Sequence, residues 1–503
     1  MRTLRILALV LLFVFLGLLL VHSLGSINQD IGRHLKLGQI IWETKSVPKT
    51  NLFSFTETDY PFVNHHWLSE VVFYLLSGVI GLKGLILFKT AVILAAFGII
   101  FAALYKKTGL WPLVISFTVG VLIFDRTDVR PEIFSYLFLA IFLAAIFKAK
   151  YSQNYKWLYA LPIIQLFWIN VHIYFALGPG LLFLFLIDRL VHKESAAILK
   201  KLVLVFLITC AVTLINPNFV RGALQPFMIL GNYGYSIVEN QSIFFLKDYG
   251  ALLTPIWLFE FSLILLILSF VVTIKRGARK ITFELLTALV FAVLGARMVR
   301  NFGIYALVLV PITALNISAC QSPSWLTKKK TVIVLLIITS LIFVWLTFSV
   351  MNNKYSEWLG NGKKFGLEIP VGTAKGVEFV KQNNIKGPVF NNFDVGSFLI
   401  WKLYPDQKVF VDGRPEAYSV EFFENIYKPM QEDPKMWKYY SDKYGINYIF
   451  FAHADITPWA RQFLFNISQD PNWPLVYKDG SVAIFLKRIP ENSALIKKFE
   501  IKQ

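Results

Sequence analysis

Residues 331–350 read TVIVLLIITSLIFVWLTFSV and contain no charged side chain, and the lysines 328–330 stand directly before them. An α-helix rises 1.5 Å per residue, so roughly 20 apolar residues cross the ~30 Å hydrocarbon core of a bilayer. Similar apolar runs fill the chain before this one. The sequence therefore predicts a polytopic α-helical membrane protein with about eleven transmembrane helices, over residues 4–24, 84–105, 110–124, 133–148, 157–170, 173–191, 199–215, 251–274, 281–299, 302–319 and 331–350.

The composition agrees with a membrane protein. Of the 503 residues, 56% are apolar and 16% are charged, whereas a soluble domain has about 45–50% apolar and about 25% charged residues. These values exclude a disordered chain, a coiled coil and an ordinary cytosolic enzyme. The first run, 4–24, is long for a signal peptide and no clear cleavage site follows it, so we expect an uncleaved first helix rather than a removed signal.

The apolar excess ends near residue 352. Residues 1–351 carry a net charge of +16, while residues 352–503 carry +3 and contain no long apolar run. We therefore expect a transmembrane domain over 1–351 and a separate C-terminal domain over 352–503. The charge surplus of the membrane part favours a role in topology over nucleic acid binding. Cys210 and Cys320 fall in or beside apolar runs, which excludes a disulfide framework and a cysteine metal site.

The basic residues also predict the orientation. With a cytoplasmic N-terminus every inner connection is basic, as the positive-inside rule requires, and the C-terminal domain lies outside the plasma (inner) membrane. Segment 67–82, WLSEVVFYLLSGVIGL, is short, carries Glu70 and is apolar mostly on one side, so we interpret it as an interfacial helix. The alternative, a true span, would invert every later loop. The inner basic residues are Lys106, Lys107, Lys148, Lys150, Lys156, Arg189, Lys193, Lys200, Lys201, Lys275, Arg276, Arg279, Lys280, Lys328, Lys329 and Lys330.

The predicted outer side collects the ionisable and polar residues that stand at helix ends. Such a group is costly near the membrane unless it has a partner or a task. Because ATP is not normally available on that side, an enzyme there would use a lipid-linked substrate or an energy-independent reaction. These residues are Asp30, His34, His65, His66, Glu70, Asp125, Asp128, Glu132, Asn170, His172, Arg297 and Arg300.

The first outer loop, 25–83, reads DIGRHLKLGQIIWETKSVPKTNLFSFTETDYPFVNHHWLSE over 30–70, and the next reads DRTDVRPE over 125–132. The order of these features resembles that in the GT-C superfamily of integral-membrane glycosyltransferases. An acid follows the first span, amphipathic and interfacial helices come next, and a second acidic motif and an outer C-terminal domain follow. The segments RPEIFSYLFLAIF (130–142) and NNFDVGSFLIWKLYP (391–405) resemble bacterial GT-C-like membrane proteins.

The resemblance implies transfer of a sugar from a polyprenyl-phosphate donor to an extracytoplasmic glycan, lipid or protein. Asp30 would accept the proton of the acceptor, and Asp128 would orient the acceptor or hold a divalent cation, Mg or Mn. Asp30 is the other candidate ligand of that cation. The acidic pair usual in the family is absent, because Ile31 follows Asp30. Guanidinium forks match phosphate oxygens, so the phosphate candidates are Arg126, Arg130, Arg297 and Arg300. Further candidates for substrate contacts are His34, His65, His66, Glu70 and His172.

Each candidate also has a structural alternative. Asp30 caps a helix at 31–42, and the charges of 125–130 form a local ion-pair cluster. Arg297 and Arg300 reach to lipid headgroups. Residues 65–70 form a satisfied interfacial cluster, or His66 and Glu70, one turn apart, share a metal. For His172 the alternative is a packed interfacial group.

The C-terminal domain alternates strand-like and helical patterns, which predicts a small α/β domain with a largely parallel sheet. The strand-like runs are Pro388–Asn391, Val409–Asp412, Ile446–Phe451, Leu475–Tyr477 and Val482–Leu486. At the carboxyl ends of such strands we expect a ligand site, or ordinary turn capping, formed by Asn391, Asn392, Asp394, Asp412, Gly413 and Arg414. The outer loop 216–250 either covers a lipid-binding groove or is a passive interfacial hairpin.

Three classes of function fit these features. A GT-C-type glycosyltransferase is the leading prediction, with membrane lipids as further partners and no nucleic acid. The second is a transporter or flippase for a lipid-linked saccharide, which would need polar groups deep in several spans. The third is a membrane scaffold whose C-terminal domain binds a partner. The scarcity of acids in the predicted spans favours the enzyme.

Overall fold

The computed structural model describes the chain except for residues 1, 25–29, 125, 229–230, 232, 278–279, 320–328, 361, 370–371, 454, 456 and 502–503. Asp125, Arg279, Cys320 and Lys328, named above, lie outside the described residues. The chain forms two compact units. The helical unit comprises Met1–Ser23, Lys83–Pro226 and Ile237–Leu367, and the mixed unit comprises Leu24–Leu82, Phe227–Ser236 and Glu368–Gln503.

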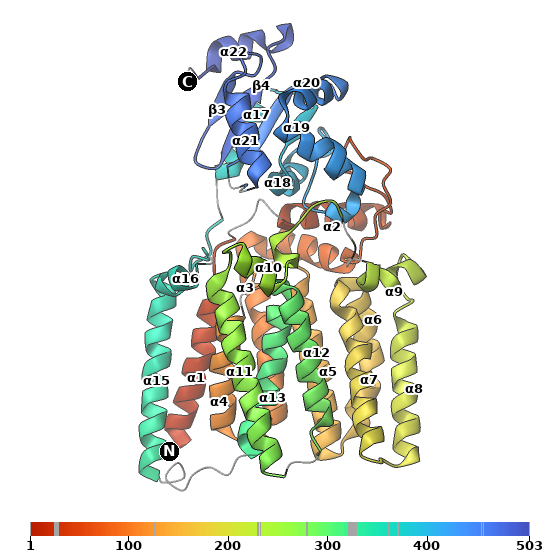
Figure 1. Cartoon of the computed structure of the whole chain (residues 1–503), viewed down its shortest axis with the longest axis vertical. Helices are drawn as coiled ribbons and strands as arrows, with labels where there is room; N and C mark the ends of the chain where they lie inside the picture. The colour runs from red at the N-terminus through yellow and green to blue at the C-terminus, as the bar shows by residue number, and fades with distance from the viewer. Residues whose placement is uncertain are drawn as a thin grey trace. The chain divides into compact units, whose positions relative to one another are not determined.

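Long helices run side by side in the helical unit (Figure 1), and each predicted apolar run contains one of them. They are α1 (Arg2–Leu20), the second part of α3 (Trp67–Thr108), α4 (Leu110–Ile123), α5 (Glu132–Ser152), α6 (Leu161–Val171), α7 (Leu177–Val191), α8 (Ala196–Val212), α11 (Leu253–Lys275), α12 (Thr282–Arg297), α13 (Phe302–Ala319) and α15 (Lys329–Met351). Short helical elements join them: α9 (Phe219–Met228), α10 (Ile243–Asp248), α16 (Lys354–Leu359) and the turns Tyr155–Ala160, Ile173–Ala176, Val238–Asn240 and Val299–Asn301.

Among the described residues, seven helices are long and apolar enough to cross a membrane. They include α1, α3, α5, α11 and α15, and α7 and α13 together with the short turn that precedes each. The others, α4, α6, α8 and α12, are shorter, from 11 residues in α6 to 17 in α8. The predicted polytopic membrane protein is confirmed, while the number eleven and the orientation stay predictions.

Helix α3 is interrupted at Gly81, whose φ of 66° and ψ of 179° are not helical. A glycine adopts this conformation without the steric penalty of a Cβ. The break falls at the end of segment 67–82, which the sequence predicts to be separate from the span at 84–105. It also falls beside the division of the chain after Leu82, so the first part of α3 belongs to the mixed unit.

Helix α13 forms the centre of the helical unit. It is buried from Phe302 to Asn316, and α4, α5, α11 and α12 all pack against it. Glycines permit two of these close approaches, because a Cβ at Gly120 would meet Val310 and one at Gly303 would meet Tyr136. Small residues at helix interfaces are typical of packing inside a membrane.

A buried ion-pair network joins α5, α7 and α12. The Lys150 ammonium lies 3.0 Å from Asp188 and 2.5 Å from Glu284, and Tyr151 donates a hydrogen bond to Glu284. Arg189 donates two further bonds to Asp188. Every carboxylate of this network therefore has at least two donors, as a buried charge requires.

The mixed unit contains a four-stranded sheet of β1 (Val389–Asn391), β2 (Tyr448–Ala452), β3 (Leu475–Lys478) and β4 (Val482–Leu486), in the order β1-β2-β4-β3. Only β1 and β2 are parallel; β4 is antiparallel to both of its neighbours. The prediction of a largely parallel sheet is therefore wrong. The short turn between β3 and β4 makes a hairpin, which must be antiparallel. The run 409–412 is not a strand, since its one bridge joins Val409 to Ser54.

Helices cover this sheet, as the alternation of strand-like and helical patterns predicts. The helices of the mixed unit are α2 (Gly32–Thr44), α17 (Gly372–Gln382), α18 (Phe393–Leu403), α19 (Lys428–Glu432), α20 (Pro434–Lys443), α21 (Pro458–Ser468) and α22 (Ser493–Phe499). Shorter turns are Pro415–Ala417, the π-turn Phe422–Tyr427 and Pro490–Asn492.

The first outer loop packs with the C-terminal residues inside the mixed unit. The Asn51 amide donates to the Ala417 carbonyl at 3.0 Å and accepts a bond from Arg414 at 2.8 Å. Ser54 donates to the Phe410 carbonyl, and α2 packs against α18. The two packed units therefore differ from the two domains that hydropathy predicts, 1–351 and 352–503. Packing joins segments that are far apart in the chain, whereas hydropathy divides the chain at a single residue.

Candidate functional sites

Asp30 lies directly before α2, in the mixed unit. The N-cap of α2 is Ile31 and has no side-chain cap bond, so Asp30 does not serve as the predicted cap. Its carboxylate is 22% exposed and lies 3.4 Å from the Arg33 guanidinium. A positive charge beside a carboxylate favours its ionised form, which is the form that accepts a proton.

Two further acids stand at the carboxyl ends of the parallel strands. Asp394 follows β1 in the first turn of α18, and Asp455 follows β2. Asp455 accepts bonds from Asn392 and from the amide and hydroxyl of Thr457. Burial raises the pKa of Asp394 to about 7, and the charges of Asp455 and Asp30 add to the effect. A carboxyl with a pKa near neutrality exchanges a proton readily at physiological pH.

A small notch lies beside Asp30, at Gly413. A Cβ there would lie 3.4 Å from the Ser397 hydroxyl and 3.5 Å from an Asp30 carboxylate oxygen. Ser397 is fully buried, and its hydroxyl has no hydrogen-bond partner among the described residues. Buried hydroxyls nearly always have a partner. A methyl-sized group at this position would therefore contact both the Asp30 carboxylate and the Ser397 hydroxyl.

The other residues predicted at this edge of the sheet are used structurally. Asn391 donates to the Val411 carbonyl at 2.7 Å and accepts from the Phe410 amide. Asp412 accepts two bonds from Arg414 and one from Tyr418. All of these side chains are buried. Asn391, Asn392, Asp412 and Arg414 thus have structural bonds, mostly between segments rather than as turn caps, whereas Asp394 remains a candidate for chemistry.

The predicted residues around Glu70 also come together. Glu70 is fully buried and accepts bonds from His34 at 2.9 Å and from Asn64 at 2.6 Å. The rings of His34 and His66 lie 5.6 Å apart, and that of His65 is 4.0 Å from His66. Burial and the charge of Arg33 lower the pKa of His34. This geometry is that of a satisfied cluster which joins α2 to α3, and substrate contact by these residues stays a prediction.

In the helical unit, three of the four predicted arginines gather around Glu239. Arg126 lies 2.5 Å from Glu239 and 2.8 Å from Glu132, and Arg130 lies 3.1 Å from Glu239. Arg300 donates to Asn240 at 2.9 Å. Burial alone would raise the pKa of Glu239, but Arg126, Arg130 and Arg300 hold it well below its usual value. The cluster has three guanidinium groups for two carboxylates, a surplus of positive charge.

The fourth arginine and His172 lie apart from this cluster. Arg297 is exposed at the end of α12, and it joins none of the contacts that the structure shows in this cluster. His172 is buried and accepts a bond from Ser135 at 2.8 Å, while Ser135 accepts one from Trp168. The geometry of His172 matches the packed alternative.

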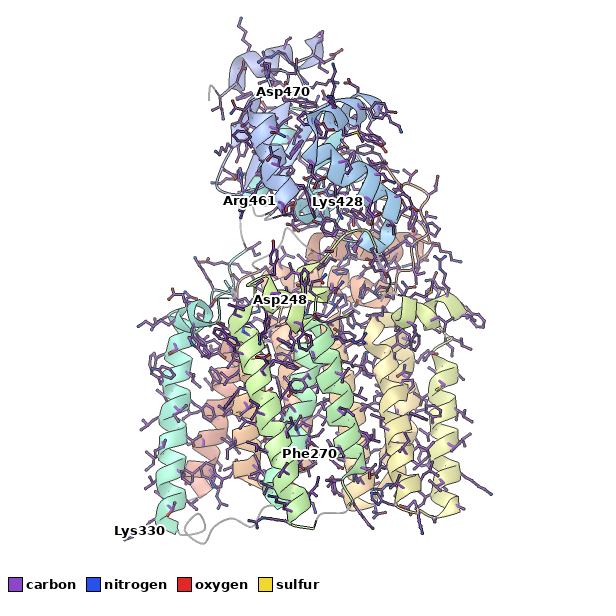
Figure 2. All side chains as sticks on the ribbon, in the orientation of Figure 1. Asp248, Phe270, Lys330, Lys428, Arg461 and Asp470 are labelled. Atoms are coloured by element: carbon purple, nitrogen blue, oxygen red, sulfur yellow. The ribbon has the colours of Figure 1, made fainter. Side chains whose placement is uncertain are left out.

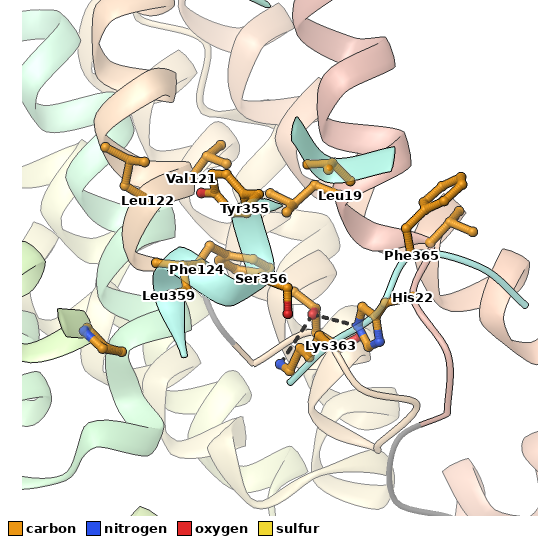
Figure 3. Close-up of a pocket in the computed structure, with 14 residues that line it drawn as sticks. Leu19, His22, Val121, Leu122, Phe124, Tyr355, Ser356, Leu359, Lys363 and Phe365 are labelled. Carbon is orange, nitrogen blue, oxygen red and sulfur yellow. Dashed lines mark hydrogen bonds between the residues drawn. The ribbon is translucent and has the colours of Figure 1, made fainter. Parts of the chain in front are cut away.

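Asp128 lies in a second polar cluster of the helical unit, with His22, Lys89, Thr127 and Lys363. Figure 3 shows two of these residues, His22 and Lys363, in the lining of a pocket. The Lys89 ammonium is fully buried and donates to His22 Nε2 at 2.8 Å and to the Thr127 carbonyl. Nδ1 of His22 lies 3.1 Å from the Ser23 carbonyl. His22, Thr127 and Lys363 line a small cavity of about 30 Å³.

The sequence analysis missed Lys89, His22, Lys363 and Glu239. Lys89 had a usable signal, because an ionisable residue inside an apolar run is functional by default, and Lys89 is the one charged residue of the run 84–105. His22 closes the first run in the same way. Glu239 and Lys363 gave no signal, since both stand in segments without a recognisable motif.

The predicted divalent cation was tested against these clusters. Among the residues that the structure describes, no group of three or more His, Cys, Asp or Glu side chains could hold a metal ion. Mg²⁺ often takes only one or two carboxylates and completes its shell with water and substrate oxygens. Metal binding by Asp30 or Asp128 stays a prediction, and no step below is routed through a metal.

The fold of this chain is similar to those of solved membrane glycosyltransferases, although the sequence identity is low. The oligosaccharyltransferase AglB from Archaeoglobus fulgidus, in complex with an inhibitory peptide and a dolichol-phosphate, is similar to this chain with a TM-score of 0.62 at 11% identity, over 96% of this chain and 75% of that one. ArnT from Cupriavidus metallidurans in the apo state is similar with a TM-score of 0.56 at 12% identity, over 100% of this chain and 99% of that one. No family model and no curated protein match the sequence.

Proposed function

We propose that this protein is a GT-C-type glycosyltransferase of the plasma (inner) membrane. It moves a sugar from a polyprenyl-phosphate-linked donor to an extracytoplasmic glycan, lipid or protein. The observation that carries the proposal is the notch at Gly413, where the Asp30 carboxylate and the unpartnered Ser397 hydroxyl lie beside the same small space. The GT-C-like fold supports it, and the dolichol-phosphate bound to AglB is a donor component of the proposed kind.

In the proposed reaction, an acceptor hydroxyl binds in the notch and Ser397 positions it. The hydroxyl oxygen attacks the anomeric carbon of the donor, and its proton passes to the Asp30 carboxylate. The bond from the anomeric carbon to the phosphate oxygen breaks, and its electron pair leaves with the lipid phosphate. Asp394 is the second carboxyl of this site that is able to hold the proton, since its pKa lies near 7.

The leaving phosphate requires cations, because charge develops on its oxygens as the bond breaks. Arg126, Arg130 and Arg300 supply a surplus of positive charge in the helical unit. Guanidinium groups donate charge-assisted bonds in a fixed fork. We therefore propose this cluster as a phosphate site within the helical unit.

The test is a pair of glycine substitutions in the mixed unit. Gly413→Ala places a methyl group in the notch at ordinary contact distances of 3.4–3.5 Å, so the fold should tolerate it. Gly480→Ala is the matched control, because nothing lies within 4 Å of its Cβ position. We expect Gly413→Ala and Asp30→Asn to abolish the glycans that are lost on gene deletion, measured by mass spectrometry, at unchanged membrane abundance. Normal glycans in both variants would refute the assignment of this site.

A further inference from the structure

A second site lies elsewhere in the mixed unit, in a groove between α19, α20, α21 and the segment that follows α21. The groove has a volume of about 610 Å³. Sites for small molecules usually measure roughly 300–1,000 Å³. None of the residues assigned to the transfer reaction lines it.

Two buried polar atoms line this groove without a hydrogen-bond partner among the described residues: the indole nitrogen of Trp437 and the amide oxygen of Gln431. Trp437 is 5% and Gln431 is 1% exposed. The amide nitrogen of Gln431 is held by the Tyr427 carbonyl at 3.0 Å, which fixes the orientation of the free oxygen. A buried donor or acceptor without a partner is costly, so these two atoms in the wall of the groove are candidate contacts for a ligand.

The walls combine aromatic rings with neutral amides. The ring of Trp473 lies 5.2 Å from that of Trp437, and Phe465 is 65% exposed beside them. Aromatic rings offer large apolar faces for contact with a ligand. The amide side chains of Asn466, Gln469 and Asn472 line the same groove.

The charges that line the groove balance, with Asp433, Asp442 and Asp470 against Lys438, Lys487 and Arg488. Several are already paired within the protein. Lys487 lies 2.7 Å from Asp442, and Arg488 lies 2.6 Å from Glu500. An anionic or cationic ligand would therefore find no surplus of opposite charge.

We propose that this groove binds a neutral saccharide. A sugar ring has an apolar face of C–H groups, which stacks on an aromatic ring, and a rim of hydroxyls that both donate and accept hydrogen bonds. The groove supplies both kinds of contact, with the exposed Phe465 ring for the face and Trp437, Gln431 and the amides for the hydroxyls. This inference goes beyond the proposed transfer, because it assigns binding without chemistry.

The test is calorimetric titration of the full chain in lipid nanodiscs. A maltoside detergent must be avoided, because its head group is itself a saccharide. The probes are maltotetraose and chitotetraose, with a sulfated tetrasaccharide and an unglycosylated tetrapeptide as comparisons. We expect at least one neutral tetrasaccharide to bind saturably, and Phe465→Ala to weaken it at least tenfold. Tyr439→Ala is the matched control, since this ring is 60% exposed on α20 and does not line the groove.

Trp437→Phe provides a second measurement, because it removes the indole donor and retains an aromatic ring. It should weaken binding severalfold at an unchanged melting temperature. Three outcomes would overturn the proposal: no saturable binding of either neutral probe, equal affinity in the parent and Phe465→Ala, or tighter binding of the sulfated probe or the peptide. Binding requires no donor, so its failure is distinguishable from a failure of transfer.

Discussion

Asp394 differs from the neighbouring acids of the mixed unit. Asp412 is neutralised by Arg414, and Asp455 accepts three hydrogen bonds, whereas the charges that act on Asp394 are those of two other acids. Its carboxyl is therefore stabilised in the protonated form. The raised pKa distinguishes Asp394, a candidate for proton transfer, from Asp412 and Asp455, whose bonds stabilise the fold.

A pH-dependent stability follows for Asp394→Asn. The pKa of Asp394 rises from 3.8 to about 7 on folding, so the carboxyl's contribution to stability is present below pH ~4 and is lost as the pH rises through ~7. An amide resembles the protonated acid at every pH. We expect Asp394→Asn to be more stable than the parent by about 1–2 kcal/mol at pH 8, after solvent screening, and nearly equal at pH 4, as measured by thermal unfolding.

Asp479→Asn is the control, because its expected change in stability at pH 8 has the opposite sign. Burial would raise the pKa of Asp479, but the amides of Val482 and Ser481 lower it below its usual value. This variant should be less stable than the parent at pH 8. A variant of Asp394 that loses stability at pH 8 in the same way would contradict the raised pKa.

At Arg300, a lysine keeps the charge and removes the guanidinium fork. If Arg300 contacts the donor phosphate, Arg300→Lys should raise the donor KM about fivefold to tenfold, the equivalent of roughly 1 kcal/mol. Arg297→Lys should leave the KM unchanged, because Arg297 is exposed at the end of α12. Donor titrations in liposomes measure both, and equal KM values in the two variants would place the phosphate elsewhere.

At the scale of elements, the network of Lys150, Asp188 and Glu284 joins α5, α7 and α12. Breaking a buried pair costs about 3–5 kcal/mol, because an uncompensated charge remains. We therefore expect Glu284→Gln to lower the melting temperature strongly. Glu260→Gln is the matched control, since Lys247 and Glu260 form an exposed pair of the kind worth at most about 1 kcal/mol. Equal melting temperatures would show that the network does not hold the helices.

The helices were predictable from the sequence, because each apolar run is a local signal. The break in α3 was predictable for the same reason, since Glu70 and one-sided apolarity distinguish segment 67–82 from a span. The topology of the sheet was not predictable from the sequence, because β4 pairs with β2, a strand distant in the chain. Residues 409–412 have the pattern of a strand, yet they pair with the first outer loop by a single bridge.

The candidate site was predictable only in part. Asp30 and Asp394 were identified by their positions after a span and after a strand. That the charge of Asp30 acts on the Asp394 carboxyl could be seen only in the three-dimensional structure, because the two residues are far apart in the chain. Lys89 was concealed in an apolar run, and the groove at Trp437 has no sequence motif.

At the scale of the whole molecule, the orientation in the membrane is open to a direct test. Reporter fusions at Lys107, Lys193 and Lys329 should be cytoplasmic, and a fusion at Gly480 should be extracytoplasmic, because each predicted inner connection is basic. Figure 2 shows Asp248 and Lys330 at opposite ends of the helical unit, so fusions at these two positions should differ. A cytoplasmic Gly480 would exclude an extracytoplasmic acceptor.

The mixed unit takes residues from both ends of the chain, and this has a consequence for biosynthesis. Residues 24–82 leave the ribosome long before residues 368–503, yet Asn51 and Ser54 bond to Arg414 and Phe410. The early segment must wait for synthesis of the last one before its buried groups find partners, and such partly folded species attract chaperones and proteases. Maturation should therefore be slow after synthesis ends, and a chain truncated after helix α15 should be degraded.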